Sequence, residues 1–173
     1  MLAIPRPAPE SLSPGAAQYV AQVPEGDLLA FLETQTDQFD HVISALDEAR
    51  GGHRYAPGKW SLKEVLGHIN DTERICAYRL LCIARGETQP LPGFEQDDYV
   101  ASAHFDQRSL GDLLAEFLDI RRASLSLLKS LDKTALNRAG VANGRPYQAS
   151  GLAYLLAGHA QHHFSVMTAR YLP

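Results

Sequence analysis

Four stretches of the chain place apolar residues three and four positions apart, which is the period of an amphipathic α-helix. These stretches cover residues 27–50, 61–85, 109–131 and 150–171. The apolar stripe of the first comprises Leu28, Leu29, Phe31, Leu32, Phe39, Val42, Ile43 and Leu46. At a rise of about 1.5 Å per residue, each helix spans roughly 33–38 Å. We therefore predict an all-α fold, an up-down four-helix bundle.

Local signals mark where the predicted helices begin and end. Each helix starts at a residue whose side chain can accept hydrogen bonds from the first turn: Asp27, Ser61, Ser109 and Ser150. Ser61 and Glu64 have the spacing of a capping box, and Gly51-Gly52 is expected to end the first helix. Asn143-Gly144 is typical of a tight turn, which predicts a small hairpin before the last helix.

Two segments fall outside this helical pattern. Residues 1–25 contain five prolines, which predict an extended N-terminal arm with one short helical turn around residues 16–20. This arm either frays or lies along the rest of the protein, which we expect to be a single domain over residues 26–173. Residues 87–108 are irregular apart from a short helix near residues 97–103, and a connection of this length is commonly functional.

The composition narrows the classes of function. The chain has 173 residues, and 16 Lys and Arg against 20 Asp and Glu give a formal net charge of −4. No basic run is present, so a nucleic-acid partner is not expected. The sequence has neither an uncharged apolar run of membrane-spanning length nor the pattern of a signal peptide, so we expect no membrane partner and a cytoplasmic location. Cys76 and Cys82 form no C-x-x-C pair and are expected to be reduced thiols.

Seven histidines carry the candidate chemistry, and three of them share a pattern. His159 and His163 are four residues apart on the last predicted helix, so their side chains project from one face and can reach one divalent metal. His68, on the second helix, shares its side with core-facing residues. Three unpartnered imidazoles in an apolar interior would cost several kcal/mol. Either a shared cation removes this cost, or each imidazole finds its own hydrogen-bond partner in the core.

The sequence around His68 resembles a family signature. Residues 58–74 read G-K-W-S-L-K-E-V-L-G-H-I-N-D-T-E-R, which contains the pattern W-S-x-x-E-x-x-x-H-x-x-D-x-E. Residues 159–163 then read H-x-x-H-H. In residue type, order and spacing these motifs are similar to those of the DinB-like superfamily of helical-bundle metalloproteins, in particular its YfiT-like branch. The resemblance covers residues 26–171.

This resemblance implies a metal site and an enzymatic function. The family's metal ligands fall on His68, His159 and His163, and the implied cofactor is a divalent metal such as zinc or nickel. Characterised relatives transfer a low-molecular-weight thiol, such as bacillithiol or mycothiol, to an electrophile, whereas others are described only as metal-dependent hydrolases. The resemblance also implies a small-molecule substrate and a homodimer. It assigns no catalytic residue.

Residues near the predicted ligands are candidates for supporting roles. Asp71, three residues after His68, could orient an imidazole N–H or line the pocket. Trp60 is expected to pack on the start of its helix or to form a pocket wall. His162 is turned about 100° from the neighbouring ligand and is expected to be exposed or beside the site. Glu73 does not share the helix face of His68, so we expect it to form an ion pair at the surface.

The remaining histidines, His41, His53 and His104, show no such pattern and are expected at the surface. Two alternatives to a metal-dependent enzyme stay open at this point. The chain could be a metal-binding or stress-response module without turnover, or a structural bundle whose histidines are satisfied core residues.

Overall fold

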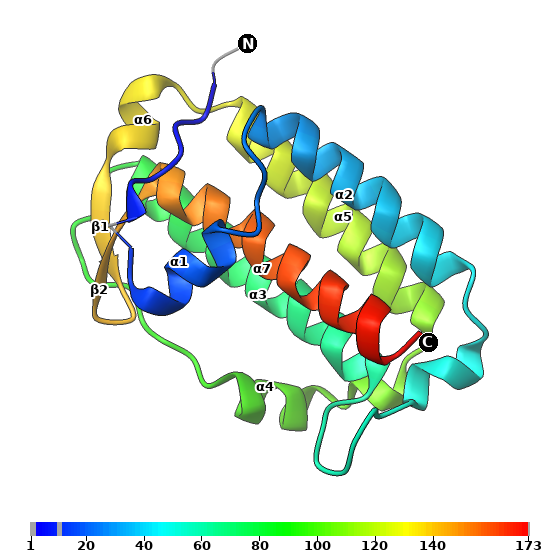
Figure 1. Ribbon diagram of the computed structural model, residues 1–173. Helices are drawn as coiled ribbons and strands as arrows, with labels where there is room; N and C mark the ends of the chain where they lie inside the picture. The colour runs from blue at the N-terminus through cyan, green and yellow to red at the C-terminus, as the bar shows by residue number, and fades with distance from the viewer. Residues whose placement is uncertain (1–2, 10–11, 173) are drawn as a thin grey trace.

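The computed structural model describes residues 3–9 and 12–172. Four long helices form a bundle (Figure 1): α2 (Leu28–Ser44), α3 (Leu62–Ala84), α5 (Leu110–Lys129) and α7 (Ala149–Arg170). The shorter elements are α1 (Pro14–Val20), the 3₁₀ helix η2 (Glu48–Gly52), α4 (Gln96–Ala103), the 3₁₀ helix η3 (Phe105–Gln107), α6 (Lys133–Asn137), β1 (Ala139–Ala142) and β2 (Arg145–Gln148). The predicted all-α four-helix bundle with a hairpin before its last helix is confirmed. Residues 1–2 and 10–11 of the predicted arm and residue 173 of the predicted domain lie outside the described residues.

Side-chain caps begin three of the long helices, as predicted. Asp27, Ser61 and Ser109 accept hydrogen bonds from backbone amides in the first turns of α2, α3 and α5. At α3 the capping box is complete, because the Glu64 carboxylate also accepts a hydrogen bond from the Ser61 amide at 2.8 Å. These acceptors pair amides that the first turn of a helix otherwise leaves free.

The first long helix is shorter than predicted. α2 ends at Ser44, so Gly51-Gly52 does not end it. The Asp47 side chain accepts a hydrogen bond from the Ala49 amide at 3.0 Å, and this cap starts the separate 3₁₀ helix η2, which contains the two glycines. A second capping side chain close behind the first helix therefore divides the predicted segment in two.

The hairpin leads directly into α7. Asn143 and Gly144 have φ values of 50° and 68°, which are the left-handed conformations of the predicted tight turn. The Ala149 amide donates to the carbonyl of Arg138 at 2.9 Å, so α7 starts as soon as the strand pairing ends. Ser150 consequently lies inside the first turn of α7 and is not its N-cap, which corrects the prediction.

The long helices do not follow their sequence order around the bundle. α2 and α7 run in one direction, whereas α3 and α5 run in the other (Figure 1). The long helices therefore do not alternate in direction along the chain, which corrects the predicted up-down order. α5 and α7 each pack against both α2 and α3, so α2 and α3 lie on a diagonal. Because α3 and α5 are parallel, residues 85–109 have to return along the bundle to connect them. This connection contains α4, the short helix predicted near residues 97–103.

The N-terminal arm lies along the bundle. Its helix α1 packs against α7, and Ile4, Val20 and Val23 are buried in the hydrophobic core. The Arg6 guanidinium donates to the carbonyls of Val20 at 3.2 Å and Val23 at 2.5 Å, which joins the beginning of the arm to its end. Of the two arrangements that the prolines allowed, the structure therefore has the packed one.

A charged pair lies in the centre of the bundle. The side chains of Glu73 on α3 and Arg121 on α5 are 2% and 0% exposed and are joined by hydrogen bonds of 2.8 and 2.7 Å. Arg121 also donates to Gln35 on α2 at 2.8 Å, and Gln35 donates to Gln161 on α7 at 3.0 Å. The prediction of a surface pair for Glu73 is therefore wrong, because its face of α3 is covered by α5.

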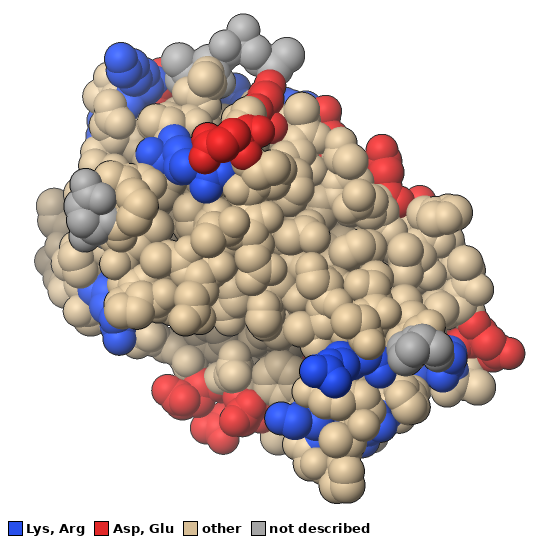
Figure 2. Space-filling view, viewed as in Figure 1, with Lys and Arg blue, Asp and Glu red and all other residues tan. Residues whose placement is uncertain are grey.

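Charged side chains form separate groups on the surface. In the view of Figure 2, acidic and basic groups lie near the edges and a broad uncharged area lies between them. This face has no continuous basic surface of the kind that binds nucleic acid. Within residues 3–9 and 12–172, the helices are too short or too polar to cross a bilayer. Cys76 and Cys82 are free thiols, as predicted.

Candidate metal centre

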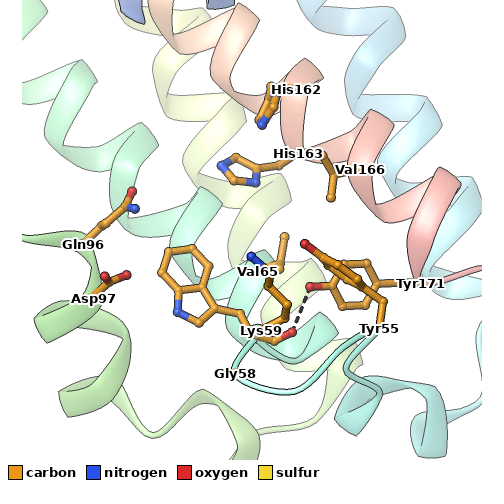
Figure 3. Close-up of a pocket in the computed structure, with 11 residues that line it drawn as sticks. Tyr55, Gly58, Lys59, Val65, Gln96, Asp97, His162, His163, Val166 and Tyr171 are labelled. Atoms are coloured by element: carbon orange, nitrogen blue, oxygen red, sulfur yellow. Dashed lines mark hydrogen bonds between the residues drawn. The ribbon is translucent and has the colours of Figure 1, made fainter.

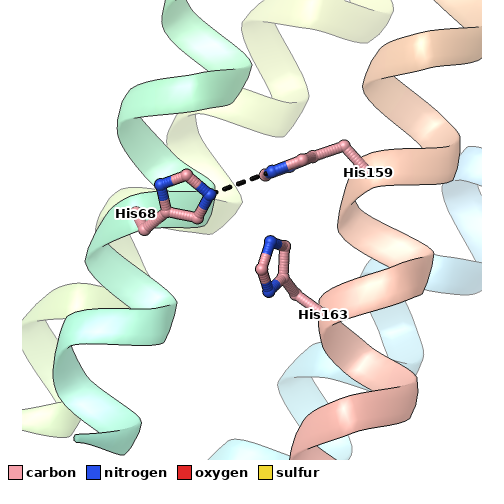
Figure 4. A group of neighbouring side chains, drawn as sticks. All are labelled: His68, His159 and His163. Carbon is pink, nitrogen blue, oxygen red and sulfur yellow. Dashed lines mark hydrogen bonds between the residues drawn. The ribbon is translucent and has the colours of Figure 1, made fainter. Parts of the chain in front are cut away.

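The three histidines with the predicted ligand pattern come together inside the bundle (Figure 4). His68 projects from α3, and His159 and His163 project from successive turns of α7. One ring nitrogen of each histidine lies within 4.8 Å of the other two. The Nε2 atoms of His68 and His159 are 3.0 Å apart. Because α3 and α7 pack directly against each other, the bundle itself holds the three rings at a common point.

Burial keeps these imidazoles neutral. His68 and His159 are only 3% and 7% exposed, and His163 is half-buried. Burial lowers the pKa of His68 to about 4 and that of His163 to about 3. Burial, and then the neighbouring histidines, lower the pKa of His159 well below its ordinary value. At neutral pH each ring therefore keeps one unprotonated nitrogen, which is the form of imidazole that binds a metal.

One pair of these nitrogens has the spacing of two ligands of one divalent ion. With metal–nitrogen bonds of about 2.0–2.1 Å and ligand angles of about 90–110°, the two coordinating nitrogens of a pair of imidazole ligands lie roughly 2.8–3.4 Å apart. The 3.0 Å between the Nε2 atoms of His68 and His159 falls in this range. An all-nitrogen donor set suits zinc, nickel or cobalt better than magnesium or calcium. The residues present therefore fit the metal that the sequence motifs imply.

Thr72 lies beside the outer nitrogen of His68. Its buried hydroxyl is 3.5 Å from Nδ1, one helical turn further along α3, where it can accept the Nδ1–H and leave Nε2 for a metal. Sequence reasoning missed Thr72, although its i, i+4 spacing from His68 was a signal for it. Asp71, which the sequence pattern offers for this role, instead forms an ion pair with Arg74 at 3.9 Å. Burial raises the pKa of Asp71, and the charge of Arg74 opposes this effect.

A cavity of about 390 Å³ opens beside the histidines (Figure 3). It is lined by Tyr55, Gly58, Lys59, Trp60, Val65, Gln96, Asp97, His162, His163, Val166 and Tyr171. The Trp60 ring lies 4.8 Å from the ring of His68, so it both covers this ligand and forms a wall of the cavity. The Tyr171 hydroxyl donates to the Trp60 carbonyl at 2.8 Å, which joins the end of α7 to the start of α3. The volume suits a small molecule, since ligand pockets typically measure about 300–1,000 Å³.

The long connection between α3 and α5 forms part of this cavity. Gln96 and Asp97, at the start of α4, lie in its wall (Figure 3). A second cavity of about 310 Å³ adjoins the first and shares Gly58, Lys59, Trp60 and Asp97 with it. Beyond positioning two helices, the connection therefore supplies side chains to the space next to the candidate ligands.

The other histidines occupy two kinds of position. His162 is half-buried beside the site, with its ring 5.1 Å from that of His163, and it lines the cavity. It does not belong to the group of three whose nitrogens approach within 4.8 Å among the described residues. The three histidines predicted at the surface, His41, His53 and His104, are exposed.

Comparison with known proteins agrees with the motifs and the fold. The sequence matches the DinB superfamily over residues 31–167. A protein of Oceanobacillus iheyensis, named as an inferred metal-dependent hydrolase, is 25% identical over 137 residues, which cover 78% of each chain. The structure of YfiT from Bacillus subtilis, inferred to be a metal-dependent hydrolase and noted for an unusual four-helix bundle topology, matches with a TM-score of 0.74 at 16% identity and covers 92% of this chain and 88% of that chain.

A second solved structure shares the fold. The mycothiol-dependent maleylpyruvate isomerase matches with a TM-score of 0.65 at 16% identity, over 84% of this chain. The chain spans 61% of the length of that isomerase, and identity at this level shows a common fold alone. The family match, in contrast, extends over most of the sequence and includes all three candidate metal ligands. The protein therefore belongs to the DinB superfamily.

Proposed function

We propose that this protein is a divalent-metal-dependent enzyme that hydrolyses a small molecule, with His68, His159 and His163 as the metal ligands. The observation that carries the proposal is the meeting of three neutral, largely buried imidazoles within 4.8 Å, next to a cavity of about 390 Å³. Purely structural histidines need neither a common point nor an adjoining cavity. The names given to the Oceanobacillus and Bacillus relatives support hydrolysis as the reaction.

Three protein ligands leave a coordination position open, which distinguishes a catalytic site from a closed structural one. When bound, zinc or nickel supplies Lewis acidity that lowers the pKa of a coordinated water or thiol towards neutrality. The chain itself provides binding and orientation. Thr72 fixes the ring of His68 through Nδ1, Trp60 keeps water from one side of the site, and the cavity holds the substrate against His163.

Transfer of a thiol to an electrophile is a second candidate function. The observation in its favour is the adjoining cavity of about 310 Å³, because a reaction of two molecules needs space for both. The two cavities share the Trp60 and Lys59 walls, so reactants bound in them would lie next to each other. A low-molecular-weight thiol is the co-substrate that this reaction requires, and the name of the mycothiol-dependent isomerase gives an example within the same fold.

Elemental analysis of the purified protein tests the metal site first. We expect close to one zinc or nickel ion per chain, and we expect its loss in His68→Ala. The matched control His41→Ala removes an exposed histidine of α2 and should keep the metal. A wild-type protein without metal after purification and reconstitution would contradict the proposal and favour a structural bundle.

Activity measurements on the metal-loaded protein then separate the reactions. Turnover of esters or amides without added thiol supports hydrolysis, whereas turnover of an electrophile only in the presence of a thiol supports transfer. If the protein with its metal site fully occupied turns over neither the esters and amides nor the electrophiles with thiol, it is better described as a metal-binding module without turnover. In each active case His68→Ala should abolish the reaction and His41→Ala should leave it unchanged.

A further inference from the structure

A fourth histidine faces the cavity without belonging to the group of candidate ligands. His162 precedes His163 on α7, and both rings line the same cavity (Figure 3). Successive residues of a helix point about 100° apart, so His162 cannot reach the point at which the other three rings meet. Its ring is nevertheless half-buried and only 5.1 Å from that of His163. A side chain in this position contacts whatever molecule occupies the cavity.

The hydrogen bond on the other side of the ring determines its protonation pattern. The Gln22 amide nitrogen lies 3.2 Å from Nδ1 of His162. An amide nitrogen can only donate, so Nδ1 has to accept, and the proton of the neutral ring is then on Nε2. Among the described residues Nε2 has no hydrogen-bond partner, and the ring lines the cavity. The ring therefore presents an N–H donor to the cavity instead of a lone pair.

The N-terminal arm holds Gln22 firmly in this position. Val20 and Val23, on either side of it, are buried in the core, and Arg6 donates to the carbonyls of both. The Tyr19 ring also stands edge-on to the ring of His162, with a centroid distance of 5.3 Å. These contacts fix the backbone before and after Gln22, so its amide is an ordered partner for His162.

We propose that His162 is a ligand-binding residue of the cavity, which donates a hydrogen bond from Nε2–H to an acceptor atom of the bound substrate, and that Gln22 is the positioning residue that sets this tautomer. The acceptor class is a carbonyl or carboxylate oxygen, or a thiolate sulfur. The same lining contains the cation Lys59 and the anion Asp97, and Lys59 can pair with negative charge on such an acceptor. The role in substrate binding rests on the proposed function, whereas the tautomer does not.

Nitrogen NMR of the histidines tests the tautomer directly. In protein labelled with ¹⁵N-histidine, measured both without metal and with zinc, we expect the neutral form of His162 to carry its proton on Nε2 and not on Nδ1. Gln22→Glu replaces the donor by a carboxylate of the same shape that can only accept, so it should place a proton on Nδ1. Gln18→Glu adds the same charge to an exposed position of α1 and should leave the pattern as it is. The proposal would be overturned if the wild-type His162 ring were protonated at Nδ1, or if Gln22→Glu left the protonation pattern of this ring unchanged.

Binding of azide to the cobalt(II)-substituted protein tests the donor role. Azide serves as a small anionic probe, and its binding is followed in the visible spectrum of cobalt. We expect His162→Phe to weaken azide binding about five- to tenfold, the amount expected for one lost hydrogen bond, at unchanged cobalt content. His162→Gln, which keeps an N–H donor, should restore most of the affinity, and His41→Phe should have no effect. Circular dichroism checks that each variant is folded.

The outcomes separate this inference from the proposed function. Unchanged azide affinity in His162→Phe would refute the donor role, and loss of cobalt from that variant would show that His162 is a metal ligand instead. If the wild-type protein binds no cobalt, the proposed function fails. The NMR measurement on the metal-free protein would then still decide whether Gln22 sets the tautomer of His162.

Discussion

Replacing Glu73 by glutamine tests whether the charged pair inside the bundle stabilises the fold. The substitution keeps the size and shape of the side chain and removes its charge. The guanidinium of Arg121 then stays in the core without a counter-ion. Because the Arg121 side chain is 0% exposed, water cannot take the place of the lost carboxylate. The variant therefore isolates the cost of an unpaired buried charge.

The size of this cost follows from the contacts of the pair. Removing one partner of a buried ion pair typically costs about 3–5 kcal/mol. Glu73 accepts two hydrogen bonds from Arg121, at 2.8 and 2.7 Å, and a glutamine can accept only one of them. Gln35 still accepts from the third donor at 2.8 Å, so we expect the lower part of the range, about 3 kcal/mol. In a chain of this length that corresponds to a melting temperature lower by about 6–12 °C.

Urea unfolding followed by circular dichroism at pH 7 measures this loss. Glu33→Gln is the matched control, because Glu33 pairs with Lys129 at 2.7 Å with side chains 53% and 49% exposed, and it should cost less than about 1 kcal/mol. The double variant Glu73→Met, Arg121→Met removes both charges of the pair and should be more stable than Glu73→Gln. A loss in Glu73→Gln no larger than that in Glu33→Gln would refute the reasoning.

Three further predictions concern the arm, the metal and the buried thiol. A Cβ atom at Gly158 would lie 2.1 Å from the carbonyl oxygen of Tyr19, so Gly158→Ala should displace α1 and lower the melting temperature by several degrees. Gly15 has open space around it, so Gly15→Ala should not lower the melting temperature. Equal effects of the two substitutions would contradict the close contact at Gly158. At free metal about 100-fold above the dissociation constant, metal should stabilise the wild-type protein by about 2.7 kcal/mol, and a chelator should remove this gain; in His163→Ala a chelator should change nothing. Burial raises the pKa of Cys76 from 9.0 to about 12, so above pH 9.0 the unfolded state loses a thiol proton that the folded state keeps, and the free energy of unfolding should fall with rising pH. Urea titrations at pH 8 to 10 should show a shallower fall in Cys76→Ala, and identical slopes would contradict the assignment.

Features that depend on neighbouring residues were predictable from the sequence. Asp27 and Ser61 cap their helices through amides two and three residues away, and Asn143-Gly144 adopts the turn that its backbone preferences favour. His159 and His163 share a face of α7 because they are one helical turn apart. In all these cases the interaction joins residues a few positions apart, so the local sequence is enough to predict it. No local spacing relates His68 to the other two histidines; its place among core-facing residues made it a candidate, and the family motif then implied that all three are ligands.

Contacts between distant segments were not predictable, because they depend on how the helices are placed. The helical period places Glu73 on a different face of α3 from His68. From the sequence alone, that face can be exposed to solvent or covered by a neighbouring helix. Only the position of α5, parallel to α3 and reached through a connection that runs along the bundle, brings Arg121 to this carboxylate. Gln22 and His162 are likewise 140 residues apart and meet because the arm packs on α7. Variants at Glu73 and Gln22 therefore test the part of the protein that a motif of three histidines does not specify, namely the surroundings that the whole fold builds around them.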